Sequence, residues 1–346
     1  MRKFIPLAIM CLLLAWPVAT VQAAPPPDGP PGLERAIEVK AHHEEALLGV
    51  KGVAGAGVGL NGDGRAAIIV FTEAPGVRGL PASLESVPVV VQFSGKFVAL
   101  PKPEKPGKPP KPPEEPPIDP TARFERPVPI GVSTGHLNIT AGTIGARVTD
   151  GENVYALSNN HVYADENKAK RGDPVLQPGP IDGGTAPDDT IGTLYSYEPI
   201  VFSTGASNLI DAAIALSDTG QLGNATHVDG YGTPKSATLT ASINMKVKKY
   251  GRTTGLTSGR VYAVNATVNV GYDSGVARFV NQIIITPGSF SAGGDSGSLI
   301  VADAKGKNRA DNNKPVGLLF AGSDFFTVAN PIDEVLSRLG VTIDGE

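Results

Sequence analysis

A proline-rich tract at residues 101–120 sets the strongest limit on how this chain can fold. The tract reads PKPEKPGKPPKPPEEPPIDP and holds ten of the 31 prolines in the 346-residue sequence. Proline lacks a backbone N–H and disrupts helices and sheets, so such a stretch forms an extended, semi-rigid spacer. The sequence therefore predicts two folded parts joined by a linker. A ligand for SH3 or WW domains is the alternative, but the position of the tract between two patterned regions favours a linker.

The first 23 residues have the pattern of a signal peptide. Arg2 and Lys3 precede an apolar run, and residues 21–23 form a small-x-small cleavage pattern. We expect cleavage after Ala23 or Ala24, a secreted or periplasmic protein, and no stable membrane insertion afterwards. The only Cys and the only Trp of the chain lie inside this segment. The mature chain is therefore expected to have no disulfide, no catalytic thiol and no thiolate metal site.

Composition and charge exclude several classes of protein. A formal net charge of -4 offers no basic surface for nucleic acid. The chain is 41% hydrophobic and only 18% charged, so it is not wholly disordered, and its 42 glycines are not periodic as in collagen. The composition does not indicate an oligomeric state.

Residues 24–100 predict a small α+β module. Apolar periodicity predicts a helix at 33–48, and the Asn-Gly-Asp-Gly sequence at 61–64 favours a hairpin turn. The predicted strands lie at 53–60, 66–71, 87–92 and 96–100. Its position after the signal peptide suggests a propeptide that assists folding or blocks the active site of the following domain. A retained binding or anchoring domain is the alternative.

Residues 121–346 read as a domain of many short strands followed by one helix. The predicted strands lie at 141–148, 153–158, 210–216, 244–250, 258–270, 278–286, 297–302 and 315–320. Short strands separated by Gly, Asn and Asp turns indicate a β-sandwich or β-barrels. The final helix is expected to have Asn330 as its N-cap and Pro331 in its first turn, and to end at Gly340.

Residues 293–298, which read GGDSGS, form the segment most informative about chemistry. Flanking glycines let a substrate approach Ser296 closely, and the amides of Gly294 and Ser296 can converge on one oxyanion. A surface turn is the alternative in so glycine-rich a chain. The segment is not the Gly-x-Ser-x-Gly elbow of α/β hydrolases, because Ser298 stands at its last position.

A nucleophilic serine needs a base and a carboxylate that orients the base. His161 lies at the end of a predicted strand, and Asp211 lies at the entrance of an apolar strand, where an unpaired charge is costly. The chain order His161, Asp211, Ser296 is that of the chymotrypsin triad. The remaining histidines lie across the linker or in loop-like surroundings, and other nearby acids are expected to be solvated. These residues are His42, His43, His136, His227, Asp182, Asp188, Asp189 and Asp218.

Two segments resemble known secreted proteases. VKKYGRTTGLTSGRVYAVNATVNV at 247–270, together with GGDSGS, resembles the streptogrisin-like branch of the chymotrypsin family, and SNNHV is similar to the histidine motif of HtrA-type enzymes. The resemblance spans about residues 130–345. It implies a mainly β, chymotrypsin-like double β-barrel with a C-terminal helix, preceded here by the small α+β module. It further implies a serine endopeptidase that acts on proteins or peptides and needs neither a metal nor an organic cofactor.

This sequence departs from the family pattern at three points. Asn160 replaces the usual small residue before the histidine, Ser298 replaces a glycine, and the common disulfides are missing. The resemblance also implies that a buried cation holds Asp295, and Arg252 and Lys249 are the candidates.

The same resemblance suggests substrate-binding residues. Phe290 and Ser291 are expected near the base of the primary specificity pocket, and Phe320 and Gly322 in the strand that pairs with an extended substrate. A phenylalanine at 290 argues against a preference for Lys or Arg, unless Phe290 packs in the core. The alternative function is a catalytically silent fold that serves as a binding or adaptor module; an esterase or lipase lacks support from the chain order.

Overall fold

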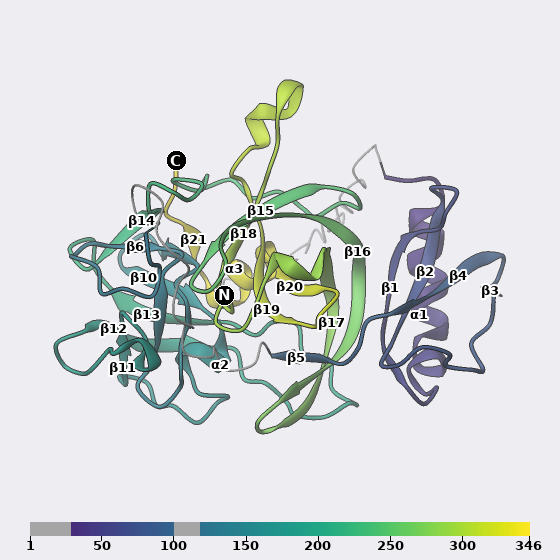
Figure 1. The fold of residues 1–346 in the computed structure, drawn as a ribbon, viewed down its shortest axis with the longest axis horizontal. Helices are drawn as coiled ribbons and strands as arrows, with labels where there is room; N and C mark the ends of the chain where they lie inside the picture. The colour runs from purple at the N-terminus through teal and green to yellow at the C-terminus, as the bar shows by residue number, and fades with distance from the viewer. Residues whose placement is uncertain (1–28, 100–117) are drawn as a thin grey trace, which may run out of the picture.

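The computed structural model describes residues 29–99 and 118–346 (Figure 1). The expected signal peptide at 1–23 and most of the expected linker lie outside the described residues. The fold is mainly β: two barrels lie side by side, and the α+β part lies at one end of the molecule. Within the described ranges, no helix has the length and apolar character needed to cross a bilayer.

The first barrel is an eight-stranded antiparallel sheet that carries His161 and Asp211. Its strands run in the order β21 (Thr342–Ile343), β9 (Ala146–Thr149), β10 (Val154–Ser158), β13 (Ala213–Ser217), β12 (Thr190–Tyr197), β11 (Pro174–Leu176), β7 (Ser133–His136) and β8 (Gly142–Thr143). A parallel pair, β6 (Val128–Ile130) and β14 (Leu222–Thr226), lies beside it. The alternation of side chains along β10 buries both faces of the strand, with Ala156 in one apolar cluster and Tyr155 and Leu157 in another.

The second barrel is a closed ring that carries Ser296. Its strands are β15 (Lys246–Gly251), β18 (Leu299–Ala302), β19 (Pro315–Gly322), β20 (Thr327–Pro331), β17 (Gly275–Thr286) and β16 (Gly255–Tyr272). The ring closes because β15 pairs with both β18 and β16. The two barrels share an apolar core that also includes Ile332 and Val335 of α3 (Ile332–Leu339). That shared core fixes the two halves of the site relative to each other.

The C-terminal helix begins differently from the sequence prediction. Asn330 is not its N-cap, because the cap position is Pro331 and no side chain caps the helix. Asn330 is instead fully buried on β20, where its side-chain oxygen accepts a hydrogen bond from the backbone N–H of Asp211 at 3.0 Å. The prediction was wrong because the partner of Asn330 lies more than a hundred residues away.

The N-terminal part joins the second barrel through its own sheet. Its elements are α1 (Leu33–Leu48), β1 (Val53–Leu60), β2 (Ala66–Thr72), β3 (Ser83–Leu84) and β4 (Val87–Phe93). As predicted, residues 61–64 form the turn between β1 and β2. Helix α1 buries Ala36, Val39 and Leu47 against this sheet. β1 also pairs antiparallel with β16, so the strands form one continuous sheet with the second barrel (Figure 1).

The last strand of this part pairs with the barrel. β5 (Phe97–Ala99) lies between the end of β16 and the end of β19. Val98 is opposite Gly271 on one side and Gly322 on the other, whereas Ala99 is opposite Ala321. The sequence predicted this strand but placed it within the small module.

The pairing of β1 with β16 requires a glycine at position 55. A Cβ atom there would lie 2.6 Å from the carbonyl oxygen of Thr267 and 2.8 Å from a methyl carbon of Val268. We therefore expect Gly55→Ala to lower the free energy of unfolding by about 1–3 kcal/mol, as overpacking does, measured by urea unfolding. Gly62→Ala is the control, because a Cβ atom at that turn position meets nothing within 4 Å. Equal stability of the two variants would contradict the close pairing.

Candidate active site

His161 and Asp211 approach each other from neighbouring strands of the first barrel. His161 lies in the short helix α2 (Asn160–Tyr163) just after β10, and Asp211 lies two residues before β13, which pairs with β10. The imidazole Nδ1 is 2.6 Å from Asp211 Oδ2, and the backbone N–H of His161 donates to Oδ1 at 3.2 Å. The carboxylate thus orients the ring and leaves Nε2 as its second functional nitrogen.

Asp211 is fully buried and held through its backbone as well. Its carbonyl oxygen accepts a hydrogen bond from the Asn159 side chain at 2.7 Å, while its N–H donates to Asn330. The hydroxyl of Tyr272 donates to Oδ2 at 2.9 Å. Because a buried charge is costly without partners, these contacts explain how an aspartate persists beside an apolar strand. Sequence reasoning did not single out Tyr272, Asn159 or this role of Asn330.

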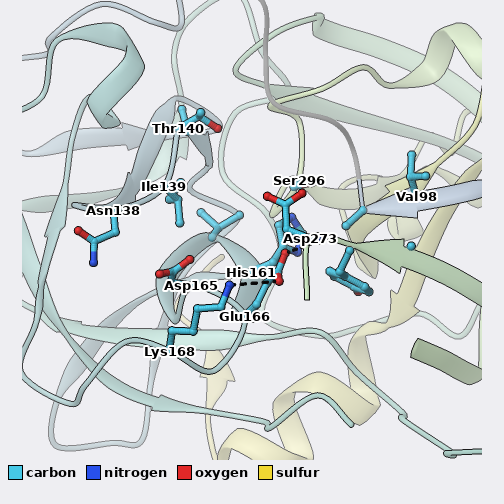
Figure 2. Close-up of a pocket in the computed structure, with 15 residues that line it drawn as sticks. Val98, Asn138, Ile139, Thr140, His161, Asp165, Glu166, Lys168, Asp273 and Ser296 are labelled. Carbon is cyan, nitrogen blue, oxygen red and sulfur yellow. Dashed lines mark hydrogen bonds and ion pairs between the residues drawn. The ribbon is translucent and has the colours of Figure 1, made fainter. Parts of the chain in front are cut away.

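Ser296 and His161 line one cavity of about 630 Å³ at the junction of the barrels (Figure 2). The Ser296 hydroxyl donates to the carbonyl oxygen of Phe320 across a long 3.5 Å. Within the described residues, His161 Nε2 is buried without a hydrogen-bond partner. Catalytic hydrogen bonds in substrate-free enzymes are often long or unformed and tighten when a substrate binds. A proton transfer from Ser296 to His161 would need the hydroxyl to leave Phe320 and contact Nε2.

The peptide preceding Gly294 has a fixed orientation. The carbonyl oxygen of Gly293 accepts a hydrogen bond from the Thr253 hydroxyl at 2.6 Å. Since C=O and N–H point in opposite directions across a trans peptide, the Gly294 N–H points away from Thr253. Gly294 has a φ of +94°, which favours glycine.

The peptide preceding Ser296 is held in the same way. Ser298 donates to the carbonyl oxygen of Asp295 through its hydroxyl at 2.6 Å and through its backbone N–H at 3.0 Å. The departure from the family pattern at Ser298 therefore adds a hydrogen bond to this loop. Among the described residues, the amides of Gly294 and Ser296 donate to no acceptor, and both remain available to an oxyanion.

A buried ion pair supports this loop. Lys249 Nζ lies 3.3 Å from Asp295 Oδ2, and neither side chain is exposed. Asp295 also accepts hydrogen bonds from the backbone N–H groups of Thr253 and Ala292. Burial lowers the pKa of Lys249, an effect that the charge of Asp295 opposes. Of the two cations expected to hold Asp295, Lys249 does so, whereas Arg252 pairs with Asp182, with Nε 2.9 Å from Oδ2.

Three residues expected in solvated or loop-like surroundings are buried, so those predictions were wrong. Asp182 has a side chain only 5% exposed because it pairs with Arg252. Asp189 pairs with Arg123, whose hydrogen bond lowers the pKa of this carboxyl to about 2. His136 lies on β7, where its two ring nitrogens contact Asp173 and the N–H of Asn138. Each partner is distant in sequence or in a loop without a regular pattern.

The four expected substrate-binding residues are not among the residues that line the cavity, although Phe320 and Gly322 contact residues that do. Phe290 is 1% exposed and packs in the core of the second barrel, which is the alternative that the sequence left open. The Ser291 hydroxyl contacts Thr327 at 2.6 Å, and Phe320 is fully buried. Gly322 pairs with β5. The cavity is lined by Ser296, by Val98 and Ala99 of β5, and by residues of three segments: 138–141, 161–168 and the β16–β17 tip at 271–273.

No group of three or more potential metal ligands occurs among the residues that the structure describes. The groups that the structure brings together at this site are a serine hydroxyl, an imidazole paired with a carboxylate, and two backbone amides.

Residues 200–327, which include Asp211 and Ser296, match the family model described as the Nal1 C-terminal domain. No curated protein matches the chain. Among solved structures, the chain is similar to a glutamic-acid-specific serine protease that uses a histidine triad in substrate binding, with 24% identity and a TM-score of 0.44 over 62% of this chain and 100% of the other. It is also similar to Thermobifida fusca protease A (17% identity, TM-score 0.43, 63% and 98% of the two chains). Cellulomonas bogoriensis chymotrypsin has 18% identity and a TM-score of 0.41, over 63% and 99% of the two chains.

The Lys249–Asp295 pair provides a test of the loop beside Ser296. Lys249→Met leaves the Asp295 charge buried without its cation, so we expect the free energy of unfolding to fall by about 3–5 kcal/mol. The matched control is Lys248→Met, because Lys248 Nζ contacts Asn312 on the other face of β15 at 3.1 Å. Urea unfolding measures both changes. A loss no larger than that of the control would show that Asp295 does not depend on Lys249.

Proposed function

We propose that this protein is a secreted serine endopeptidase with His161, Asp211 and Ser296 as its catalytic triad. The observation that carries the proposal is the 2.6 Å contact of His161 with the buried Asp211, made by an imidazole that lines the same cavity as Ser296. The free amides of Gly294 and Ser296 add a suitable oxyanion site. No other histidine in the described part of the chain combines a buried carboxylate partner with a neighbouring serine in a cavity.

These residues act by the mechanism of a serine protease. The Ser296 oxygen attacks the peptide carbonyl carbon while His161 Nε2 takes the hydroxyl proton, and Asp211 stabilises the resulting imidazolium. The amides of Gly294 and Ser296 donate to the oxyanion, and such a donor contributes about 3 kcal/mol in other enzymes. His161 then protonates the leaving amine. A water molecule, activated by the same imidazole, releases the acyl group from Ser296.

An uncharged residue before the scissile bond remains our proposal for substrate preference. Phe290 does not carry this preference, because its side chain packs in the core of the second barrel, so the preference stays a prediction from the sequence. One observation favours the alternative, a catalytically silent binding module: the Ser296 hydroxyl donates to Phe320 instead of His161.

Labelling with a fluorophosphonate tests the enzyme against the silent module. We expect wild-type protein with its linker cleaved to be labelled. Ser296→Ala should lose the label, and its rate of peptide hydrolysis should fall on the order of 10⁶-fold, since Ser296 is the nucleophile. Ser337→Ala, an exposed serine on α3, is the control and should behave as the wild type. Absence of a Ser296-dependent label on folded protein would favour the silent module.

We propose in addition that the module at residues 33–100 acts as a propeptide that blocks the active site. The support comes from β5, which pairs with Ala321 and Gly322, the part of β19 expected to bind an extended substrate. Val98 and Ala99 also line the cavity with His161 and Ser296. A peptide that adds a strand to a sheet edge needs the main-chain groups of that edge, so β5 and a substrate compete for the same position.

Disruption of β5 is expected to raise activity. In the full-length chain, Val98→Pro removes a backbone N–H from a strand paired on both sides. We expect hydrolysis of a short peptide to increase about fivefold to tenfold, the effect of losing one or two hydrogen bonds that hold the competitor. Val98→Thr keeps the N–H and a similar shape and is the control. If Val98→Pro is no more active than Val98→Thr, β5 does not block the site.

A further inference from the structure

We propose that Tyr272, at the end of β16, is a positioning residue for the triad, because its hydroxyl holds the carboxylate of Asp211 against His161. The inference rests on the proposed function and assigns a further residue to the same site. It is carried by the hydroxyl–Oδ2 distance of 2.9 Å and by the place of Tyr272 in the lining of the cavity.

Tyr272 is the one donor to the Asp211 carboxylate, other than His161, in the described part of the chain. Oδ1 accepts the backbone N–H of His161, and Oδ2 accepts both His161 Nδ1 and the tyrosine hydroxyl. Without Tyr272, both remaining donors to the carboxylate would belong to His161, the residue whose ring the carboxylate orients. Tyr272 adds a donor from a separate element, β16.

Aromatic contacts fix the tyrosine ring. Its centroid lies 5.9 Å from the His161 ring in an edge-on arrangement, and 5.6 Å from Phe202 in a second edge-on contact. The ring centroid of Phe279 lies 6.1 Å from that of Tyr272. Tyr272 therefore touches the imidazole directly as well as through Asp211, and its ring has little freedom to turn away.

The Tyr272 hydroxyl keeps its proton throughout the pH range in which a serine protease works. Burial raises the pKa of Tyr272 well above 10, and the charges of Asp211 and Glu166 raise it further. The group therefore acts only as a donor to the carboxylate. The titratable groups that face it are Asp211, Glu166 and His161.

The hairpin tip that carries Tyr272 is anchored to the first barrel. Glu166 accepts hydrogen bonds from the backbone N–H groups of Asp273 at 3.2 Å and Ser274 at 2.8 Å. Glu166 lies in a turn only five residues after His161, so one short segment carries the imidazole and holds the tip at the same time. The second barrel thereby supplies an orienting group to a carboxylate of the first.

Asn160 explains how this turn keeps its shape. Residues 165–167 all have positive φ values, of +47°, +53° and +73°, which residues other than glycine rarely adopt. Asn160 donates to Asn167 Oδ1 at 2.7 Å and accepts the Asn167 N–H at 3.1 Å. Asn160 is the residue that departs from the family pattern before the histidine, and its side chain braces the turn that places Glu166.

The test compares Tyr272→Phe with Tyr262→Phe in protein that is made as the full-length chain and then cleaved in its linker. Tyr262 lies on the same strand, but its hydroxyl contacts Gln92 at 3.3 Å, away from the triad. We expect Tyr272→Phe to lower kcat/KM about tenfold, the effect of losing a hydrogen bond to a charged group, while Tyr262→Phe stays at the wild-type value. The acidic limb of the kcat/KM profile should also move to higher pH, because a carboxylate with one donor fewer holds the protonated imidazole more strongly.

A merely structural role would lower activity without moving the acidic limb, and that outcome overturns the inference, as does wild-type behaviour of Tyr272→Phe. The NMR signal of the His161 Nδ1 proton gives a readout without turnover. If it shifts in Tyr272→Phe while the wild type shows no Ser296-dependent label, the positioning role stands and the proposed function fails. Should Tyr272→Phe not fold, a wild-type cross-peak between the Tyr272 hydroxyl proton and the His161 Nδ1 proton supports the contact, and its absence overturns it.

Discussion

A carboxylate buried at the junction of two barrels is the constraint around which the site is organised. Asp211 has no exposed surface, and an isolated charge in that position would be strongly unfavourable. Its partners come from separate elements: Asn159 and His161 follow β10, Tyr272 ends β16, and Asn330 belongs to β20. The hydrogen-bond partners of this buried aspartate come from both barrels and hold the barrels together beside Ser296.

The Ser296 loop depends on a second buried charge. Asp295 has Lys249 as its counter-ion, while the hydroxyls of Thr253 and Ser298 hold the carbonyl oxygens of Gly293 and Asp295. These hydrogen bonds fix the two peptides whose N–H groups, on Gly294 and Ser296, have no acceptor among the described residues. Donors that are oriented before the reaction need no reorganisation in the transition state. The chain achieves this order without the disulfides that are common in the family that it resembles.

The N-terminal part joins the second barrel through main-chain pairing as well as through side-chain packing. β1 extends the sheet along β16, and β5 continues along the same strand until it reaches β19. β16 therefore contacts the N-terminal part along one edge and carries Tyr272 at its end. The proposed propeptide therefore pairs with the same strand that brings Tyr272 to Asp211 of the proposed triad.

Local patterns in the sequence were enough to predict most strands, the final helix and the three residues His161, Asp211 and Ser296. Side-chain alternation and turn residues depend on neighbours in sequence, and the chain order of the triad is read directly. The role of those three residues stays a prediction, and the structure adds the contact between His161 and Asp211 and the shared cavity. What only tertiary structure decided was the choice of partners: Asn330 with Asp211, Arg252 with Asp182, β5 with β19 and Tyr272 with the carboxylate. These pairs join residues tens to hundreds of positions apart, and they form because buried polar groups must find partners wherever packing brings them together.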